Sequence, residues 1–595
     1  MNVGNLNLLW AELFLDGFAA AGGREVVVSP GSRSAPLALA AARHADLDVR
    51  VVVDERAAGF FALGQARVTG RPTLAVCTSG SAGAHYFPAV IEADEADLPL
   101  LVVSADRPPE LLDRQAAQTT RQAGFYDGHV RVALDLGAPD ADARALAGVW
   151  RAGTMAFARS LDPRPGPVHV NAPFRKPLEP TAEDGDDRTL RDEGRHLRRG
   201  GERFLPPVRV ANPTAVAALA ARCSAARRGV IVCGPGPLSQ RDAVAALAAL
   251  AGRLGFPVLA EAASQFRFAD TVPPGLVGQL ELLCPGEGLV AGDPPDFVLQ
   301  VGRPLTSTAW GRWLESAEAP PRWIVAAHGW NDPSNNAAGV VLGDLGTTLA
   351  NLAGALGEGA GAASGWGERW RLAELAATRA VVEQLGEESA RGELSESAVA
   401  RGVVSTLPAR GMLAVANSLA VREVDLACPP GLARVAVLAA RGVAGIDGSV
   451  AGAAGAASAA GLPVTALLGD LALLHDLGSL ATLRHAKAPV VIVVLANDGG
   501  RLFELLPLAG GAVDEATVRE LFVAPQGVRF AGAAEMFGLA YHRVESASAL
   551  ATALEAAHAA VGHTLIEAHI HGRPLRERRR ELWERARGLL AGSGG

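Results

Sequence analysis

Short apolar runs rich in β-branched residues alternate with helix-forming stretches along the chain, and this alternation restricts the fold more than any other sequence feature. Such runs predict strands buried on both faces, and the helical stretches supply the connections that parallel strands need. In the first part of the chain the predicted strands cover residues 24–30, 49–54, 73–78, 98–104 and 167–173. The predicted helices are Ala35–Arg43, Ala57–Val68 and Ala82–Ala93. We therefore expect a doubly wound α/β sheet here.

The same alternation begins again twice. Further strands are predicted at residues 227–236, 256–263, 296–303 and 322–328, and then at 411–418, 432–442, 463–470, 489–500 and 563–570. The sequence predicts three doubly wound α/β domains with mainly parallel sheets, at 1–180, 208–356 and 369–595. Two segments break the pattern. Residues 181–207 are dense in charge and predict an exposed linker, and the Gly-rich residues 357–368 predict a flexible one.

The composition restricts what the protein binds and where it works. Its 595 residues carry a net charge of −8, so no basic surface is predicted for nucleic acid or anionic lipid. Five cysteines occur without a C-x-x-C pair, which argues against a disulfide framework or a zinc site and favours the cytoplasm. Glu12 and Asp16 interrupt the apolar N-terminus, and the uncharged residues 448–469 are rich in Gly, Ala and Ser. We expect a buried helix there and no membrane span.

Polar loops directly follow four predicted strands of the first domain. Their sequences are Ser29-Pro-Gly-Ser-Arg33, Asp54-Glu-Arg56, Thr78-Ser-Gly-Ser81 and Ser104-Ala-Asp-Arg-Pro108. Because parallel strands end at the same edge of a sheet, and ligands bind at that edge in open α/β folds, these loops predict a binding site.

Two strands of the third domain end in oxygen ligands. Gly469-Asp470 follows one strand, and Asn497-Asp498-Gly499-Gly500 follows the next. A carboxylate, an amide oxygen and a loop carbonyl are the ligands that Mg²⁺ prefers when it also holds phosphate oxygens. The spacing alone leaves a second interpretation open, in which both are ordinary turn residues.

The pair resembles the diphosphate-binding motif of thiamine-diphosphate (ThDP) enzymes, whose usual form is G-D-G ending in N-N. Here Leu471 and Ala496 replace two of those positions. Gly469-Asp-Leu-Ala-Leu-Leu-His-Asp476 is similar to the branch that makes 2-succinyl-5-enolpyruvyl-6-hydroxy-3-cyclohexene-1-carboxylate (SEPHCHC). Other segments resemble the same branch in order: 29–36, 54–60, 78–82, 86–90, 104–108, 118–119, 417–422 and 441–448. The central domain carries the resemblance only weakly.

The resemblance implies ThDP and Mg²⁺ or Mn²⁺ as cofactors, with Asp470, Asn497 and Gly499 at the metal. It makes Glu55 the catalytic carboxylate against N1′ of the aminopyrimidine, a position that taken alone would suit a surface ion pair. Ile446 resembles the residue that props the bent cofactor, although a core isoleucine is the simpler interpretation. The full set of implied cofactor contacts is Glu55, Thr78, Ser79, Gly80, Ile446, Gly469, Asp470, Leu471, Asn497, Leu502 and Phe503.

The implied substrates are 2-oxoglutarate and isochorismate, whose carboxylates suit permanently charged arginine forks. Ser32, Arg33, Arg107 and Gln118 resemble the isochorismate side of the site. Ser418, Arg422 and Arg441 resemble the groups around the succinyl carboxylate and the second substrate. One position departs from the family: Thr308 stands where lysine is common, and Arg303 or Arg312 is left as an unassigned source of charge.

The implied reaction is decarboxylation of 2-oxoglutarate and 1,4-addition of the succinyl carbanion to isochorismate, giving SEPHCHC for menaquinone biosynthesis. Family members place ThDP between subunits, so a homodimer or homotetramer is implied. Two alternatives remain: another ThDP-dependent 2-oxoacid decarboxylase or acetohydroxyacid synthase-like carboligase, and a non-enzymatic regulator that binds a cofactor around Cys233-Gly-Pro-Gly236.

Overall fold

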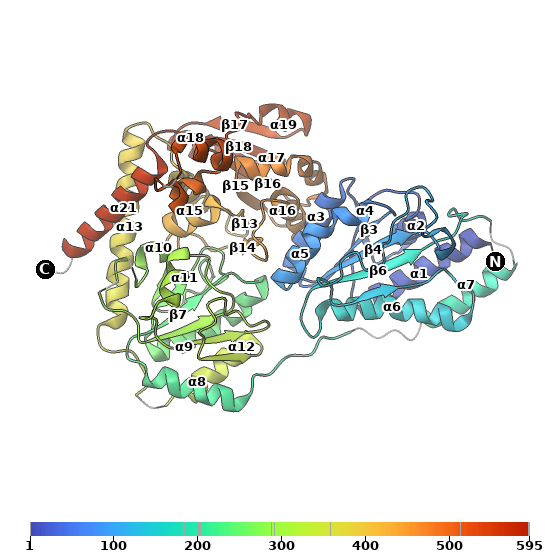
Figure 1. The fold of residues 1–595 in the computed structure, drawn as a ribbon, viewed down its shortest axis with the longest axis horizontal. Coiled ribbons are helices and arrows are strands. Elements are labelled where there is room, and N and C mark those ends of the chain that lie inside the picture. The colour runs from blue at the N-terminus through green and yellow to red at the C-terminus, as the bar shows by residue number, and fades with distance from the viewer. Residues whose placement is uncertain are drawn as a thin grey trace. The chain divides into compact units, whose positions relative to one another are not determined.

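Three six-stranded sheets form the framework of the protein (Figure 1). The computed structural model describes residues 2–182, 185–198, 204–286, 288–290, 292–357, 359–511 and 513–592. Every strand pair within the three sheets is parallel, so the predicted fold class is confirmed. Among the described residues, none of the helices combines the length and the apolar composition needed to cross a bilayer.

The chain divides into two compact units. The first unit comprises residues 1–207, 440–461 and 476–488, and the second comprises 208–439, 462–475 and 489–595. Each unit therefore contains segments from more than one of the domains expected from the sequence. The domain boundaries at 180, 207, 356 and 368 remain predictions.

The first unit holds one sheet in the order β2-β1-β3-β4-β6-β5. Its strands are β1 (Glu25–Val28), β2 (Asp48–Val51), β3 (Thr73–Cys77), β4 (Leu100–Asp106), β5 (Ala133–Asp135) and β6 (Pro167–Pro173). Its helices are α1 (Val3–Ala21), α2 (Ala35–Arg43), α3 (Glu55–Thr69), α4 (Ala82–His85), α5 (Phe87–Ala96), η1 (Pro109–Leu111), α6 (Ala143–Leu161), α7 (Gly185–Arg198), α16 (Ser449–Ala460) and η3 (Leu477–His485). Helices α1, α2 and α6 bury one face of the sheet, and α3 and α5 contact the same strands (Figure 1).

The second unit holds the other two sheets. The central one has the order β12-β11-β10-β7-β8-β9. Its strands are β7 (Gly229–Cys233), β8 (Val258–Ala260), β9 (Leu276–Val277), β10 (Phe297–Val301), β11 (Arg322–Ala326) and β12 (Gly339–Leu342). On one face lie α8 (Pro213–Ala225), α9 (Val244–Leu254) and α12 (Leu345–Ala355), with η2 (Leu238–Ala243) before α9. On the other face lie α10 (Leu280–Leu283), α11 (Thr308–Glu315) and the start of α13 (Trp366–Ala390).

The third sheet has the order β14-β13-β15-β16-β18-β17. Its strands are β13 (Met412–Val415), β14 (Ala436–Leu438), β15 (Val464–Gly469), β16 (Val490–Ala496), β17 (Ala540–Val544) and β18 (Thr564–His569). The accompanying helices are α14 (Glu396–Ser405), α15 (Leu419–Ala427), α17 (Asp470–His475), η4 (Arg501–Leu505), η5 (Pro507–Ala509), α18 (Glu515–Val518), η6 (Arg519–Val523), α19 (Ala531–Met536), α20 (Ala547–Ala559) and α21 (Leu575–Gly592).

The first and third sheets share one topology. In each, the second strand in sequence lies on one side of the first strand and the third strand lies on its other side. Such a reversal of direction leaves a crevice at the carboxyl edge, between β1 and β3 and between β13 and β15. The central sheet reverses direction between β7 and β10.

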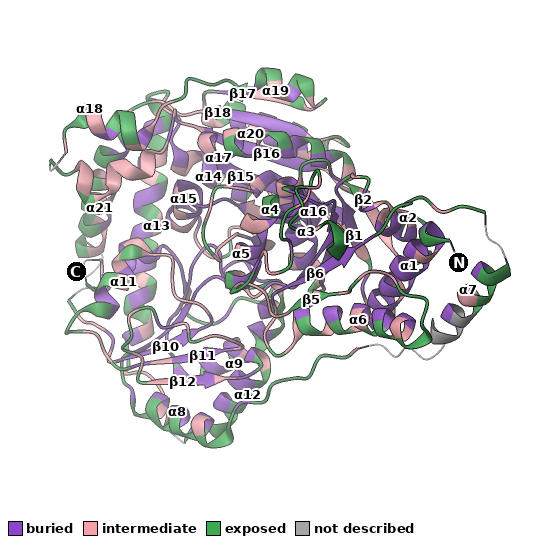
Figure 2. Cartoon of the chain, turned by 45° about the vertical axis from the view of Figure 1, so that its right-hand side comes forward, coloured by how far each residue is buried: buried purple, intermediate pink, exposed green. Residues whose placement is uncertain are grey.

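Burial follows the position of a strand in its sheet. Strands β6 and β10 are buried along their whole length, whereas helices such as α8 expose one side (Figure 2). The predicted strand at 49–54 was expected to be buried on both faces, and this is wrong. Strand β2 ends at Val51 on the edge of its sheet, and Val53 is 72% exposed. An edge strand has a neighbour on one side only, so burial there is incomplete.

The segment 181–207 contains a helix that was not expected. Residues Gly185–Arg198 form helix α7, which packs against α1 and α6 while several of its residues are exposed, and the role of the segment as a linker stays a prediction. Asp186 and Asp187 stand in its first turn, where carboxylates favour a helix N-terminus, and Leu190 packs against the core. Residues 183–184 and 199–203 of that prediction lie outside the described residues.

The Gly-rich stretch at 357–368 forms no strand or helix before Trp366 in its described part, yet it is held in place. The N–H groups of Ala362 and Ala363 donate to the carbonyl oxygens of Leu254 and Arg227, each at 2.7 Å. These bonds join the stretch to the end of α9 and to the loop before β7, and its expected flexibility stays a prediction. The predicted helix Ala82–Ala93 is divided into α4 and α5 around Tyr86.

Helices α3 and α16 touch through glycines. A methyl group on Gly64 would lie 2.1 Å from the carbonyl oxygen of Gly452, and one on Gly455 would lie 2.0 Å from that of Phe61. The two backbones therefore approach as closely as the absence of side chains allows. Because Glu55 is the first residue of α3, this contact also supports a predicted site residue.

We expect Gly455→Ala to destabilise the first unit, because the added methyl group forces α3 and α16 apart. Overpacking of this kind costs about 1–3 kcal/mol. The control is Gly386→Ala in α13, where no atom lies within 4 Å of an added methyl group and the helix gains about 0.5–1 kcal/mol. Urea unfolding of both variants followed by circular dichroism measures the difference. Equal midpoints for Gly455→Ala and the wild type would contradict the close packing.

Candidate active site

The loops after β3 and β4 meet as the sequence predicted. The Arg107 guanidinium donates to the Ser79 hydroxyl and, at 3.0 Å, to the Ala117 carbonyl oxygen. Gln118 Nε2 donates to the Ser79 carbonyl oxygen at 3.1 Å. Gly80 has φ +88°, a conformation that glycine adopts without strain. Thr78, Ser79, Gly80, Arg107 and Gln118 therefore form one polar cluster at the carboxyl edge of the first sheet.

Two guanidinium groups gather beside this cluster. Arg33 is 4% exposed and donates to the carbonyl oxygen of Phe174 at 2.6 Å. Burial lowers the pKa of Arg33, and the positive charge of nearby Arg107 lowers it further. Within the described part of the chain neither arginine forms an ion pair. The Asp106 carboxylate opposes the lowering of both arginine pKa values without forming an ion pair with either among the described residues, so the positive charge is only partly balanced and suits an anionic ligand.

Two buried polar atoms in these loops lack a hydrogen-bond partner among the described residues. They are Oγ1 of Thr78, which is 8% exposed, and Nε of Arg33. Buried polar atoms are nearly always satisfied in native proteins, so both indicate contacts that a bound molecule completes. Ser32, by contrast, is exposed and makes no hydrogen bond that would place it in this cluster.

Sequence reasoning missed the residues that support these loops. Gln122, which is 1% exposed, accepts from the N–H of Gly80 at 2.9 Å and donates to the Ala105 carbonyl oxygen at 3.1 Å. Asn171 of β6 donates to Asp106 Oδ2 at 3.1 Å, and burial raises the pKa of that carboxyl group. A single Gln or Asn carries no periodic signal, and only its partners show its role.

Glu55 begins α3 directly after a helix cap. The Asp54 side chain accepts from the N–H groups of Arg56 and Ala57 at 2.9 and 3.3 Å, and this fixes where the helix starts. The Glu55 carboxylate is half-buried and makes no hydrogen bond within the described part of the chain. Burial raises the pKa of the Cys77 thiol at the end of β3, and the negative charge of Glu55 raises it further.

The two predicted metal-ligand loops leave neighbouring strands. Gly469 of β15 pairs with Leu495 of β16, so Asp470 and Asn497 follow at the same edge. Asp470 is 6% exposed, and its oxygens accept from the N–H groups of Leu471 at 2.7 Å and Gly499 at 3.0 Å. Burial raises the pKa of Asp470, while these N–H donors oppose the rise.

Gly499 must be glycine. Its φ is +121°, and a methyl group there would lie 2.2 Å from the Val523 carbonyl oxygen. Its own carbonyl oxygen accepts from the N–H of Arg501 at 2.9 Å and keeps a second lone pair for a cation. The described residues contain no group of three His, Cys, Asp or Glu that could hold a metal ion. The predicted site needs none, because it combines one carboxylate with an amide oxygen and a carbonyl, a set that fits Mg²⁺.

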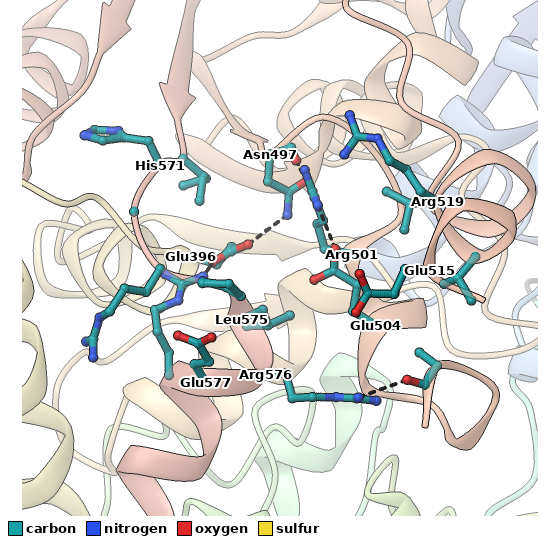
Figure 3. A pocket seen from close by; sticks show the side chains of 18 of the residues that line it. Glu396, Asn497, Arg501, Glu504, Glu515, Arg519, His571, Leu575, Arg576 and Glu577 are labelled. Carbon is teal, nitrogen blue, oxygen red and sulfur yellow. Dashed lines mark hydrogen bonds and ion pairs between the residues drawn. The ribbon is translucent and has the colours of Figure 1, made fainter. Parts of the chain in front are cut away.

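A cavity of ≈ 560 Å³ lies beside Asn497 in the second unit (Figure 3). Asn497 Nδ2 donates to Glu396 Oε1 at 2.9 Å across its wall, and Arg501 donates to the Asn497 carbonyl oxygen at 2.8 Å. Burial acts to raise the pKa of Glu396, but the charge of Arg578 and the Asn497 hydrogen bond outweigh it and hold that pKa below its usual value. Leu502 and Phe503 follow in η4, where the Phe503 and Phe522 rings lie 5.7 Å apart.

Ser418 and Arg422 stand at the start of α15. Ser418 has φ +63°, which is rare for a residue other than glycine, and strain of this kind gathers at functional sites. Arg422 donates to the Ser418 carbonyl oxygen at 2.7 Å, which holds the guanidinium over the turn. Burial lowers the pKa of Arg422, and the carboxylates of Glu281 and Glu261 oppose that effect.

Arg441 and Ile446 lie in the loop before α16, in the first unit. Glu92 of α5 accepts from the N–H groups of Gly442 at 3.1 Å and Val443 at 2.8 Å, and this anchors the loop. Ile446 is 37% exposed, so it is not the buried core residue of the simpler interpretation.

The position of the missing lysine lies in the second unit. Thr308 begins α11, whose cap Ser307 accepts from the N–H of Trp310 at 3.4 Å. Arg312 is exposed and Arg303 is half-buried. The role of both arginines stays unassigned.

Comparison with known proteins identifies the family. Residues 10–125 match the N-terminal TPP binding domain of thiamine pyrophosphate enzymes, and residues 434–568 match their C-terminal TPP binding domain. Proteins named 2-succinyl-5-enolpyruvyl-6-hydroxy-3-cyclohexene-1-carboxylate synthase are similar over nearly the whole length. The protein from Sorangium cellulosum is 44% identical over 100% of this chain and 98% of its own. Those from Myxococcus xanthus and Halobacterium salinarum are 38% and 36% identical, over 92% and 99% of this chain and 92% and 100% of their own.

The chain belongs to the SEPHCHC synthase family. The resemblance noted in the sequence is thereby confirmed, and the protein is a ThDP-dependent transferase. The roles of individual residues stay predictions, because the comparisons match segments and not atoms. ThDP supplies a diphosphate that needs a cation, and the oxygen set of Asp470, Asn497 and Gly499 fits that need.

We expect Asp470→Ala to abolish Mg²⁺-dependent retention of ThDP, because the cation that bridges to the diphosphate loses its carboxylate ligand. The control Asp270→Ala removes a carboxylate that is 78% exposed and should bind as the wild type does. Isothermal titration of ThDP with and without Mg²⁺ measures the loss. Unchanged Mg²⁺-dependent affinity in Asp470→Ala would remove this residue from the metal site.

Proposed function

We propose that this protein decarboxylates 2-oxoglutarate and adds the resulting succinyl unit to isochorismate, giving SEPHCHC, an early intermediate of menaquinone biosynthesis. The observation that carries this proposal is the full-length similarity to proteins named for that product. Buried Arg33 and half-buried Arg107 near the loop at 78–80 support it, because both substrates are polyanions. A simple decarboxylase has no need of a second anion site.

The proposed site residues have different roles in the reaction, and each role follows from the chemistry of the side chain. ThDP, when bound, supplies the nucleophilic carbon and holds the electron pair that CO₂ leaves behind. Glu55 holds a proton at N1′ of the aminopyrimidine, a task that suits a half-buried carboxylate with no competing hydrogen bond. Thr78, Ser79, Gly80 and Ile446 are the proposed cofactor contacts of the first unit, and Gly469, Leu471, Leu502 and Phe503 are those of the second.

The arginines orient the two substrates. Arg33 and Arg107, with Ser32 and Gln118, hold the carboxylates of isochorismate, whereas Ser418, Arg422 and Arg441 contact the succinyl carboxylate and the second substrate. The addition forms a carbon–carbon bond at the conjugated double bond of isochorismate and consumes one proton. Fixed guanidinium groups stabilise the negative charge that develops there.

The protein works as a homodimer or homotetramer with ThDP at the subunit interface, and it resides in the cytoplasm. The cytoplasmic location is supported by its five buried free thiols, which suit a reducing compartment. Mg²⁺ serves as the cation, and Mn²⁺ has the same ligand preference.

We expect Glu55→Gln to keep ThDP binding and lose about 10²–10⁴-fold in turnover, because an amide preserves the shape but cannot carry the proton. Glu110→Gln is the control, since that carboxylate pairs only with exposed Arg175 at the surface. Steady-state rates and ThDP affinity are measured for both variants. Near-normal turnover in Glu55→Gln would exclude it from this role.

If Arg33 and Arg107 bind isochorismate, replacing them should affect the addition step and not the decarboxylation of 2-oxoglutarate. In Arg33→Ala or Arg107→Ala, CO₂ release and the circular-dichroism signal with 2-oxoglutarate alone should stay nearly intact. Addition to isochorismate should fall by roughly 30- to 1000-fold, because a charge-assisted contact in a desolvated site is lost. Chromatographic analysis of the product, with and without isochorismate, tests the function itself. Loss of the circular-dichroism signal with 2-oxoglutarate alone would assign these arginines to the succinyl end of the site. Absence of SEPHCHC among the products of the wild type would refute the function.

A further inference from the structure

The Asn497 side chain has a fixed orientation. A side-chain amide presents an oxygen on one side and an NH₂ group on the other, and the two ends differ in what they can bind. Here Nδ2 donates to Glu396 Oε1 at 2.9 Å (Figure 3). An ionised carboxylate only accepts hydrogen bonds, so the NH₂ group must face Glu396 and Oδ1 must face away from it.

Glu396 is itself held in place. It is 2% exposed, stands at the first position of α14, and its Oε2 pairs with the Arg578 guanidinium of α21. The helix start is fixed by Ser395, whose hydroxyl donates to Glu388 Oε2 at 2.6 Å and accepts from the N–H of Ala398 at 3.2 Å. Each oxygen of Glu396 thus has its own partner, and rotation of the carboxylate would break both contacts.

A second buried ion pair of the same kind lies on the same helix. Arg579, next to Arg578 in α21, pairs with Glu423 of α15, which is 0% exposed. Glu423 also accepts from the Ser397 hydroxyl. This pair matches the first in burial and in its helix, but no hydrogen bond joins it to Asn497. It therefore provides a control for effects that come from the loss of a buried charge alone.

We propose that Glu396, held by Arg578, is a positioning residue that turns the Asn497 amide oxygen toward the cation that binds the ThDP diphosphate. This inference rests on the proposed role of Asn497 as a metal ligand. Groups that orient metal ligands from behind commonly change metal affinity 10- to 100-fold when they are replaced. A purely structural role, in which the ion pair only links α14 to α21, would affect stability without regard to the side chain at 497.

Exchanging the chemical groups of the pair distinguishes these roles. In an Asn497→Asp background, a carboxylate faces the Glu396 carboxylate without a proton between them, and the two repel each other. Glu396→Gln then supplies an NH₂ group that donates to the new carboxylate. In the wild-type background the same Glu396→Gln change removes the charge that fixes the amide and leaves Arg578 without its partner. The substitution should therefore have opposite effects in the two backgrounds.

The experiment measures the apparent Mg²⁺ dissociation constant of the full-length protein at saturating ThDP, by titration calorimetry, for all four members of this cycle. Glu396→Gln should weaken Mg²⁺ binding about 10-fold beside Asn497 and strengthen it by a similar factor in the Asn497→Asp background. The control Glu423→Gln should change the Mg²⁺ dissociation constant in the same direction in both backgrounds. Any result other than improved binding on adding Glu396→Gln to Asn497→Asp overturns the proposal.

Stability is checked by circular dichroism on each protein. If Glu396→Gln unfolds, the cycle is repeated with Arg578→Met present throughout, which removes the unpaired buried charge and keeps the comparison decisive.

Failure of the proposed metal site is distinguished by Asn497→Ala. If Mg²⁺ promotes ThDP binding equally in Asn497→Ala and the wild type, Asn497 is no ligand and both proposals fall. If Asn497→Ala loses the Mg²⁺ effect but the cycle shows no reversal of sign, only the role of Glu396 falls.

Discussion

Parallel strand pairing determines where chemistry can occur in this protein. Strands that pair in parallel leave the sheet at one edge, so the loops after β3 and β4 bring Ser79 and Arg107 into contact. For the same reason the loops after β15 and β16 place Asp470 and Asn497 on neighbouring strands. Because the first and third sheets share a strand order, each offers a crevice beside its first strand.

The sequence predicted the buried central strands well and the edge strands of the sheets poorly. Strand β6 covers Pro167–Pro173, the same residues as its predicted run, because a strand buried on both faces is mostly apolar, and its polar His169 and Asn171 are hydrogen-bonded. Four strands had no such signal, and all lie at sheet edges: β5, β9, β12 and β17. An edge strand such as β17, with the sequence Ala-Tyr-His-Arg-Val, has exposed positions that polar residues can occupy.

The same contrast holds for the candidate site. The candidate ligand-binding residues stand in loops of recognisable sequence, so the sequence alone was enough to propose Arg33, Arg107 and Asp470. The residues that hold them could not be predicted, because their partners are far away in sequence. Gln122 accepts from a residue 42 positions away, and Glu396 accepts from one 101 positions away. Only the folded chain shows that these buried side chains orient the loops.

The buried charged residues are of two kinds: those paired with an opposite charge and those without such a pair. Arg578 and Glu396 neutralise each other, as do Arg579 and Glu423, so neither pair gains from an added ion. Arg33 forms no ion pair among the described residues, and its pKa is lowered by burial and by the charge of a neighbouring arginine. The Asp106 carboxylate offsets part of this cost, and a bound anion would offset more of it. The first kind of charge therefore fixes geometry, whereas the second supplies binding free energy, and a site that must position two polyanions needs both.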